Sequence, residues 1–210
     1  MKRLVVIGAG GFGREMFAAA RESEGFGTLF EIAGFLDDDA SALDGFTGYP
    51  PVLGGVEEYR PREDDVFITA LGDIAARRRC AEAIGSKGGK FATVVHKTAV
   101  VGPNVEIGPG SFLAPGVCIT ADVRIGSHAC IFHNSSVGHD SYIGDFAHVY
   151  AQCSIGGGVK VLAGARIYPG SVVTPRRTVG EDAVVGALSA VFADVPPGGR
   201  VLGNPAMPLL

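Results

Sequence analysis

Three of the five histidines, His133, His139 and His148, lie close together in the sequence, and Asp140 directly follows His139. An imidazole exchanges protons near neutral pH, and a neighbouring carboxylate fixes its tautomer and stabilises its charged form. Such a pair combines a general base with the group that orients it. We therefore predict that His139 acts as a general base and that Asp140 is its partner.

The same three histidines can also be interpreted as metal ligands. Histidines from neighbouring subunits can meet around zinc, and His133, His139 and His148 supply that ligand type. Their spacing does not require a metal, and the four cysteines contain no C-x-x-C pair. We therefore expect the cysteines to be free thiols. We also expect the protein to bind no metal, and the alternative is a zinc site that the three histidines form between subunits.

A second candidate site lies near the N-terminus, where glycines follow the apolar residues 4–7. Gly8, Gly10 and Gly13 fit the pattern G-x-G-x-x-G, in which free N–H groups at the start of a helix hold a phosphate. Asp37 follows at about the distance expected of a carboxylate that contacts a ribose. The short segment provides only half of a dinucleotide-binding fold, which favours a mononucleotide or a nucleotide-linked ligand.

The composition of the 210 residues narrows the functional class. Apolar residues make up 47% of the chain and charged residues 19%, which indicates a folded core. The formal net charge of −4 argues against binding to nucleic acid through a basic surface. No apolar run reaches the ~18 residues of a membrane span, and glycines interrupt the apolar start too early for a signal peptide. We expect a cytoplasmic protein with no membrane partner.

A repeat with a period of six residues must position the histidines. From Val95 to Val191 every sixth residue is aliphatic, and the fourth residue after each is small or β-branched, with Arg177 as the one exception. Neither a helix nor a single strand has this period. Three hexads form one triangular coil, and stacked coils form a parallel β-helix. The aliphatic residues then fill the interior, glycines mark the corners, and the three histidines face outward, toward solvent or a neighbouring subunit.

Residues 1–90 lack this repeat and must position the glycine loop. Strands are predicted at 4–7, 32–36 and 66–71, with helices at 14–22 and 74–84. This alternation is typical of a parallel sheet, whose ligands bind beyond the carboxyl ends of the strands. We therefore predict three parts: a small Rossmann-like domain over 1–90, a β-helix over 91–196 and a C-terminal cap over 197–210.

In combination, these motifs resemble the family of sialic-acid O-acetyltransferases and bacterial nucleotide-sugar N-acetyltransferases, whose hexapeptide repeats form a left-handed β-helix. The resemblance extends over essentially the whole chain. The segments that carry it are residues 8–15, 35–38, 71–73 with Arg77, 134–136, 138–140, 147–149 and 203–206.

The resemblance implies an acetyl-CoA-dependent N-acetyltransferase that acts on a nucleotide-linked 4-amino-4,6-dideoxy sugar for bacterial surface glycan synthesis. The amine attacks the thioester directly, with His139 as general base, Asp140 as its acidic partner and His148 near the thioester carbonyl. The resemblance also implies a homotrimer in which acetyl-CoA lies along the β-helix between adjacent subunits. The residues expected to contact acetyl-CoA are Asn134, His148, Gly157, Arg176, Asn204 and Pro205.

The resemblance places the nucleotide-linked sugar in the front domain. The expected substrate-binding residues are Gly8, Gly10, Gly11, Phe12, Gly13, Asp37, Asp38, Gly72, Asp73 and Arg77. Two positions depart from the pattern of some members, which carry His in place of Phe12 and Glu in place of Asp140. The second departure shortens the carboxylate arm and keeps its charge.

Other interpretations remain open from the sequence. The same base can act on a hydroxyl, which predicts an O-acetyltransferase on sialic acid or a related sugar. A trimeric β-helix can also be a zinc lyase or a scaffold without enzymatic activity. Arg176 and Arg177 either meet the CoA phosphates or mark a local bulge with both side chains in solvent. The glycine loop with Asp37 and Asp38 favours a nucleotide-linked substrate, and hence N-acetylation.

Overall fold

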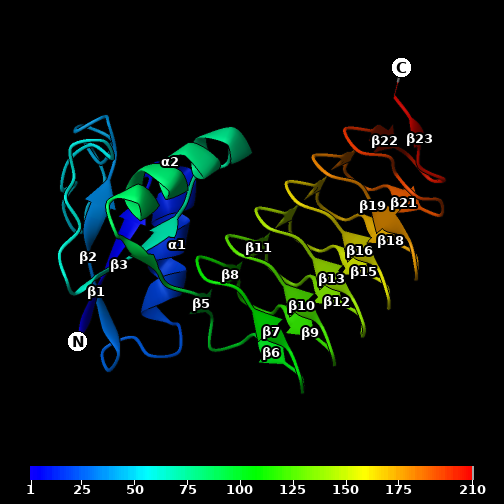
Figure 1. Ribbon diagram of the computed structural model, residues 1–210, viewed down its shortest axis with the longest axis horizontal. Coiled ribbons are helices and arrows are strands. Elements are labelled where there is room, and N and C mark those ends of the chain that lie inside the picture. Colours follow the sequence, from blue (N-terminus) through cyan, green and yellow to red (C-terminus); the bar gives the residue numbers. More distant parts are fainter. Residues whose placement is uncertain (210) are drawn as a thin grey trace. The chain divides into compact units, whose positions relative to one another are not determined.

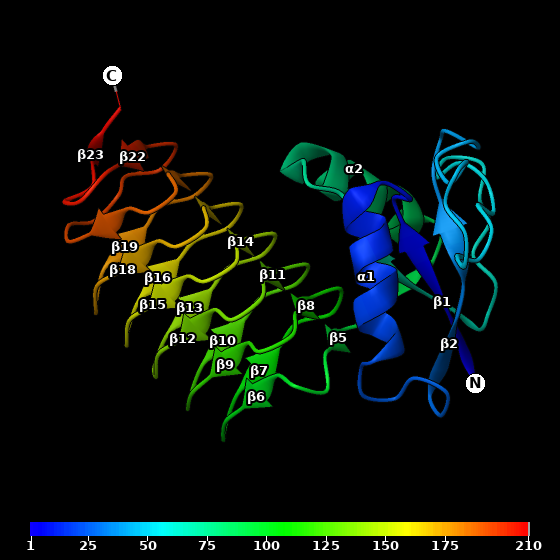
Figure 2. The ribbon, with the colours of Figure 1, turned by 180° about the vertical axis from the view of Figure 1, so that it is seen from behind.

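The computed structural model describes residues 1–209, and these form two compact units, Met1–Val94 and a second unit that begins at Val95. Figure 1 shows the order of the elements, and Figure 2 shows them from behind. Within residues 1–209, no helix combines the length and the apolar character needed to cross a membrane.

A four-stranded parallel sheet with the strand order β2-β1-β3-β4 forms the centre of the first unit. Its central strand β1 is apolar because residues Leu4 to Ile7 are buried within the unit. The predicted strands and helices are confirmed, with ends shifted by a few residues. In chain order the elements are β1 (Lys2–Ile7), α1 (Gly11–Arg21), β2 (Phe30–Leu36), β3 (Asp65–Thr69), α2 (Ile74–Ser86) and β4 (Lys90–Phe91).

The second unit is a left-handed parallel β-helix, as predicted. Each strand from β5 to β18 has two residues and pairs with the strand 18 residues further along the chain, because three hexads close one coil. The strands are β5 (Val94–Val95), β6 (Val100–Val101), β7 (Glu106–Ile107), β8 (Phe112–Leu113), β9 (Cys118–Ile119), β10 (Arg124–Ile125), β11 (Cys130–Ile131), β12 (Ser136–Val137), β13 (Tyr142–Ile143), β14 (His148–Val149), β15 (Ser154–Ile155), β16 (Lys160–Val161), β17 (Arg166–Ile167), β18 (Val172–Val173), β19 (Thr178–Val179), β20 (Val184–Val185), β21 (Ala190–Val191), β22 (Arg200–Leu202) and β23 (Met207–Pro208).

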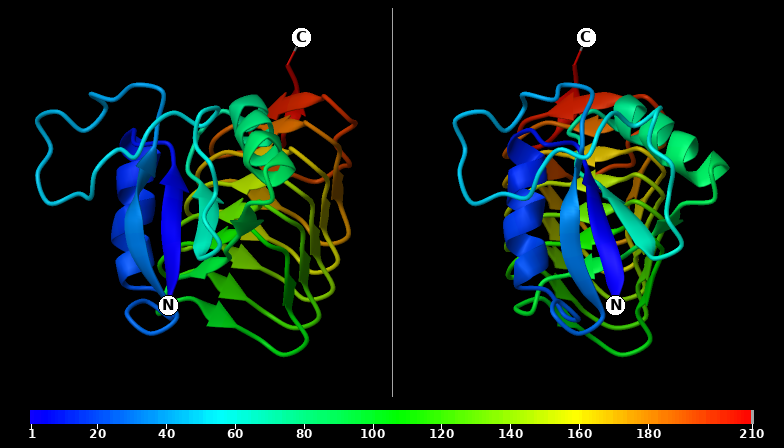
Figure 3. Two further views of the ribbon diagram at one scale, coloured as in Figure 1. Left: turned by 60° about the vertical axis from the view of Figure 1, so that its left-hand side comes forward. Right: turned by 90° about the vertical axis from the view of Figure 1, so that its left-hand side faces the viewer.

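The coils have three sides, each formed by one sheet (Figure 3). The five-stranded sheet runs from β7 to β19, the six-stranded sheet from β6 to β21, and the eight-stranded sheet from β5 to β23. The aliphatic residue of each hexad points inward and is buried in most coils. Val101 is 40% exposed, because its strand β6 lies at the end of its sheet with no coil beneath it.

The corners of the coil recur every sixth residue from Asn104 to Leu188, and all of these residues have left-handed φ values between 52° and 75°. Many of the glycines that follow the aliphatic residues are not at these corners, so the prediction that glycines mark the corners is wrong for them. Gly138 is an example, since a Cβ there would come within 2.6 Å of the backbone nitrogen of Gly157 in the next coil. Such glycines allow close stacking of the coils, whereas the corners accept Asn, Asp and other residues.

Candidate active site

The His139–Asp140 pair lies on the edge between the six-stranded and five-stranded sheets, at the corner that links β12 to β13. The Nδ1 atom of His139 is 2.6 Å from Oδ2 of Asp140, and the two side chains are 70% and 68% exposed. Because a carboxylate only accepts hydrogen bonds, Nδ1 carries the proton in this contact. The Nε2 atom of the neutral ring is then the one that can accept a proton from a substrate.

Successive coils align a column of corner residues along this edge, which we call the Asp140 edge. The column consists of Asn104, Asp122, Asp140, Gly158 and Arg176, at intervals of 18 residues and all with positive φ. The structure thus brings Arg176 and Gly157 to the same edge as the His139–Asp140 pair. Gly157 lies next to the ring of His139, since a Cβ on Gly157 would come within 2.7 Å of Nε2.

The two arginines on this edge continue the repeat without a bulge. Strand β19 keeps its register with β16, so that Lys160 faces Thr178 and Val161 faces Val179. Arg176 is exposed at its corner, and a guanidinium nitrogen of Arg177 lies 4.0 Å from Asp194. The interpretation of Arg176 and Arg177 as a local bulge is therefore wrong, and Arg176 is the arginine that is available to a ligand.

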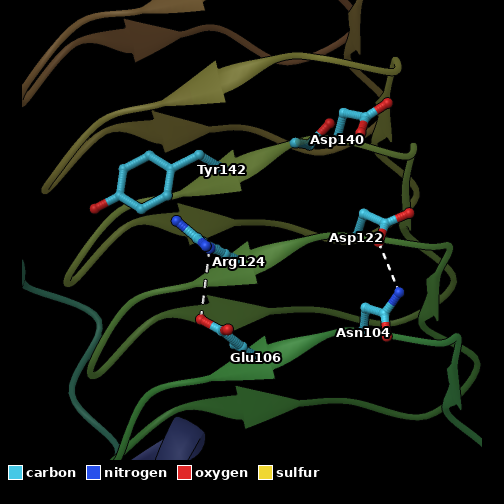
Figure 4. A pocket seen from close by; sticks show the side chains of 7 residues that line it. Asn104, Glu106, Asp122, Arg124, Asp140 and Tyr142 are labelled. Atoms are coloured by element: carbon cyan, nitrogen blue, oxygen red, sulfur yellow. Dashed lines mark hydrogen bonds and ion pairs between the residues drawn. The ribbon is translucent and has the colours of Figure 1, made fainter.

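A polar groove of about 500 Å³ begins at Asp140 and extends over the two preceding coils. One column of side chains along it is Glu106, Arg124 and Tyr142, from strands of the five-stranded sheet, and the other is Asn104, Asp122 and Asp140 from the edge (Figure 4). No motif singled out in the sequence predicted this groove. The repeat contains the signal that could have revealed the groove. Each coil has 18 residues, so Asp122 and Asn104, which lie 18 and 36 positions before Asp140, align with it in the two preceding coils.

His148 differs most from its prediction. It projects from β14 in the eight-stranded sheet, which forms the side of the coil opposite the Asp140 edge. Its ring stacks on Phe132 at 4.7 Å and on Tyr150 at 4.1 Å, and only 1% of the residue is exposed. The expectation that His148 faces solvent or a partner is therefore wrong, because its side chain is buried and stacks on Phe132 and Tyr150.

The other residues expected to contact acetyl-CoA lie apart from the base. Asn134 is an exposed corner residue on the edge between the eight-stranded and six-stranded sheets. Asn204 and Pro205, joined by a cis peptide bond, are exposed in the segment between β22 and β23. Among residues 1–209 of one copy, no group of three His, Cys, Asp or Glu side chains is arranged to hold a metal.

The glycine loop of the first unit connects β1 to the N-terminus of α1. Gly13 has to be glycine because a Cβ there would overlap the carbonyl oxygen of Gly8, which places the start of the helix directly on the strand end. Gly8 has a φ of 102° and lies against Ala70 and Leu71 at the end of β3. Gly10 and Gly11, by contrast, are exposed, and a Cβ on either residue would meet nothing within 4 Å. They form the start of α1, where the first N–H groups have no partner within the helix and can bind an anion.

Asp37 and Asp38 hold the loops at the carboxyl ends of the strands. The carboxylate of Asp37 accepts from the N–H of Ala9 at 2.8 Å and from that of Asp39 at 3.0 Å. Asp38 accepts from the N–H of Val56 at 3.2 Å. Both carboxylates retain lone pairs for a ligand, but their contacts within the chain first shape the site.

The remaining predicted substrate residues fall into two groups. Gly72 and Asp73 are exposed beside the glycine loop, and the Asp73 carboxylate caps α2 by accepting from the N–H of Ala76 at 2.7 Å. Phe12 is half-buried in the first turn of α1. Arg77 is fully buried in α2, so the structure does not present its guanidinium to a ligand.

Known families match both units. Residues 3–84 match the family described as the PglD N-terminal domain, and residues 90–187 match the GMPPB C-terminal domain. The UDP-N-acetylbacillosamine N-acetyltransferase of Bacillus subtilis (strain 168) is 32% identical over 108 residues, which cover 48% of this chain and 46% of that protein. The match thus spans about half the length of this curated relative.

Solved structures resemble the chain over its whole length. The acetyltransferase domain of PglB from Neisseria gonorrhoeae FA1090, in complex with acetyl coenzyme A, is 30% identical with a TM-score of 0.87 and 99% of each chain covered. PerB from Caulobacter crescentus, in complex with CoA and GDP-perosamine, is 29% identical with a TM-score of 0.89, and 100% of this chain and 98% of PerB are covered. WeeI from Acinetobacter baumannii AYE is 28% identical with a TM-score of 0.87 and full coverage of both chains. On the strength of these matches, the chain belongs to the family of nucleotide-sugar N-acetyltransferases that take their acetyl group from acetyl-CoA.

Proposed function

We propose that this chain transfers the acetyl group of acetyl-CoA to the amine of a nucleotide-linked 4-amino-4,6-dideoxy sugar. The observation that carries the proposal is the exposed His139–Asp140 pair, whose 2.6 Å contact leaves Nε2 as the proton acceptor. Family membership supports the reaction type, and the GDP-perosamine and CoA in the PerB complex support the substrate class. The accessible N–H groups at Gly10 and Gly11 suit the diphosphate of a nucleotide sugar.

In the proposed mechanism the neutral amine attacks the thioester carbon, and no covalent enzyme intermediate forms. Nε2 of His139 accepts the proton that the nitrogen loses as the C–N bond forms, while Asp140 stabilises the resulting imidazolium. The C–S bond then breaks, and the imidazolium returns the proton to the departing CoA thiolate. The products are the acetamido sugar and CoA.

The negative charge that develops on the thioester oxygen needs a hydrogen-bond donor. His148 is buried on the opposite side of the coil, so we assign this role to a backbone N–H group near the Asp140 edge. Arg176, two coils beyond Asp140, is the exposed cation on the same edge for the phosphates of CoA.

The proposed working form is a homotrimer with its active sites between subunits. Three large apolar side chains on or beside the six-stranded sheet, Val172, Leu188 and Phe192, are 42%, 78% and 58% exposed. Exposed apolar groups of this kind are typical of a contact surface. The six-stranded sheet borders the Asp140 edge, so a second copy that packs on this sheet would also line the acetyl-CoA site. Light scattering of the purified protein measures the number of subunits.

The decisive experiment measures CoA-thiol release from acetyl-CoA with UDP-, dTDP- and GDP-linked 4-amino-4,6-dideoxy sugars, and with free sialic acid for comparison. Turnover of one amino sugar would support the proposal and identify the nucleotide. Turnover of sialic acid alone would replace it with O-acetylation. We further propose that the product enters bacterial surface glycan synthesis in the cytoplasm, and detection of the acetamido sugar in cell extracts tests this.

A further inference from the structure

The groove beside Asp140 carries an excess of negative charge. The positive charge of Arg124 is neutralised by an ion pair with Glu106, in which the Nε atom of Arg124 lies 3.5 Å from the Glu106 carboxylate. Asp122 accepts a hydrogen bond from the Asn104 amide at 2.9 Å, and in residues 1–209 it forms no ion pair. Asp140 forms its ion pair with His139 only when the ring is protonated. Two carboxylates on neighbouring coils therefore face the groove without a permanent cationic partner.

This charge distribution favours one end of a nucleotide-linked amino sugar, the amino sugar with its ammonium group, over the other end, which carries the diphosphate. A diphosphate would be repelled by the carboxylates of Asp122 and Asp140, whose backbones are about 4.8 Å apart, the spacing of adjacent strands. An ammonium group would be attracted by both of them. The exposed ring of Tyr142 on the opposite side of the groove offers an apolar surface to the carbons of a sugar ring.

We propose that the groove holds the acceptor sugar and that Asp122 attracts its ammonium group, which makes the enzyme select an amine over a hydroxyl. This inference rests on the function proposed above. Asn104 is a positioning residue, because its amide fixes the carboxylate of Asp122. Asp140 lines the groove and also binds Nδ1 of His139, so the groove leads to the base. The ammonium group loses one proton to water before the neutral amine attacks.

The test compares two ligands in calorimetric titrations without acetyl-CoA. One is the nucleotide-linked 4-amino sugar that the wild-type enzyme acetylates fastest, and the other is its 4-hydroxyl counterpart. Asp122→Asn should weaken binding of the amino sugar about ten-fold, as expected for loss of one charged contact, and should leave the hydroxyl sugar within two-fold. The ten-fold difference should shrink as salt rises, because the carboxylate is exposed to solvent.

Two further variants separate charge from shape. Tyr142→Ala should weaken both ligands alike, since the ring contacts carbon atoms that they share. Asp182→Asn is the matched control, because Asp182 is also an exposed left-handed corner residue but lies on another edge, and it should change neither affinity.

Each outcome bears on the inference. Equal weakening of both ligands by Asp122→Asn would overturn the selection of the amine, and unchanged binding of both would overturn the groove as the sugar site. Absence of turnover of every amino sugar by the wild-type enzyme would instead refute the proposed function itself.

Discussion

The imidazole of His139 lies against Gly157 in the next coil, where a Cβ would come within 2.7 Å of Nε2. Gly157 is the second residue after the aliphatic residue of its hexad. In all the remaining hexads from Val101 to Val185, the residue at this position has a side chain, most often that of Pro or Ala. The β-helix therefore does not need glycine at this position. The absence of a side chain makes room for the ring that we assign as the base.

Gly157→Ala should lower kcat about ten-fold or more with little change in thermal stability. The new methyl group displaces the ring from its contact with Asp140, and a small displacement of a catalytic group has a large effect on rate. Steady-state kinetics together with thermal unfolding checks this. A variant that unfolds early would instead mean that the backbone at Gly157 requires glycine.

His139→Ala should reduce kcat by about 10²–10⁴, the usual contribution of a general base. His133→Ala is the matched control, because His133 occupies the same position in the preceding hexad but lies on a different edge. CoA-thiol release measures both variants. Near wild-type turnover of His139→Ala with an intact oligomer would remove His139 as the base.

Asp140→Asn should also lower kcat, with the KM for acetyl-CoA nearly unchanged. The amide cannot stabilise the imidazolium, and it can donate to Nδ1, which would place the ring proton on Nε2. Asp140→Glu should retain much of the activity because the charge remains. If Asn and Glu at this position gave equal activity, the carboxylate would have no role in catalysis.

The glycine loop gives opposite expectations for two neighbouring glycines. Gly13→Ala should lower the unfolding temperature, because its Cβ overlaps the Gly8 carbonyl oxygen. Gly11→Ala has open space around it and should leave the unfolding temperature unchanged while raising the KM for the nucleotide sugar. An unchanged KM for Gly11→Ala would argue that the diphosphate binds elsewhere.

Asp37→Ala should destabilise the protein by about 1–3 kcal/mol, because it leaves the buried N–H of Ala9 without its acceptor. Denaturant titration measures this change. Asp44→Ala, an exposed aspartate in the same loop region, is the control and should have little effect. A loss no greater than that of the control would mean that water replaces the carboxylate.

The cysteines should react with iodoacetamide in a defined order. Burial raises the pKa of the Cys153 thiol. The pKa of the Cys80 thiol is also raised, mainly by burial and to a lesser extent by the nearby negative charge of Asp38. A raised thiol pKa leaves less of the reactive thiolate at a given pH, so both should react more slowly than the exposed Cys118 below their pKa values. Peptide mass spectrometry at pH 7 and pH 9 measures the order, and denatured protein is the control. Rapid labelling of Cys153 at pH 7 would contradict it.

The six-residue period alone determined the β-helix, because only a triangular coil buries an aliphatic residue at every sixth position. The same holds for the first unit, where Leu4 to Ile7 followed by the glycine loop predicted a strand that leads into a helix, and the structure has β1 and α1 there. The pairing of His139 with Asp140 was likewise readable, because adjacent residues at a coil corner are necessarily close.

The tertiary structure decided which distant residues share one side of the coil. Gly157, Asp122 and Asn104 join His139 and Asp140 because successive coils align residues 18 positions apart, whereas His148, only nine residues from His139, lies on the opposite side under Phe132 and Tyr150. The sequence by itself determined the repeat, since hydrophobic burial imposes its period on the residues. Burial and the grouping of side chains around the base depend on packing between coils, and only the folded chain fixes these.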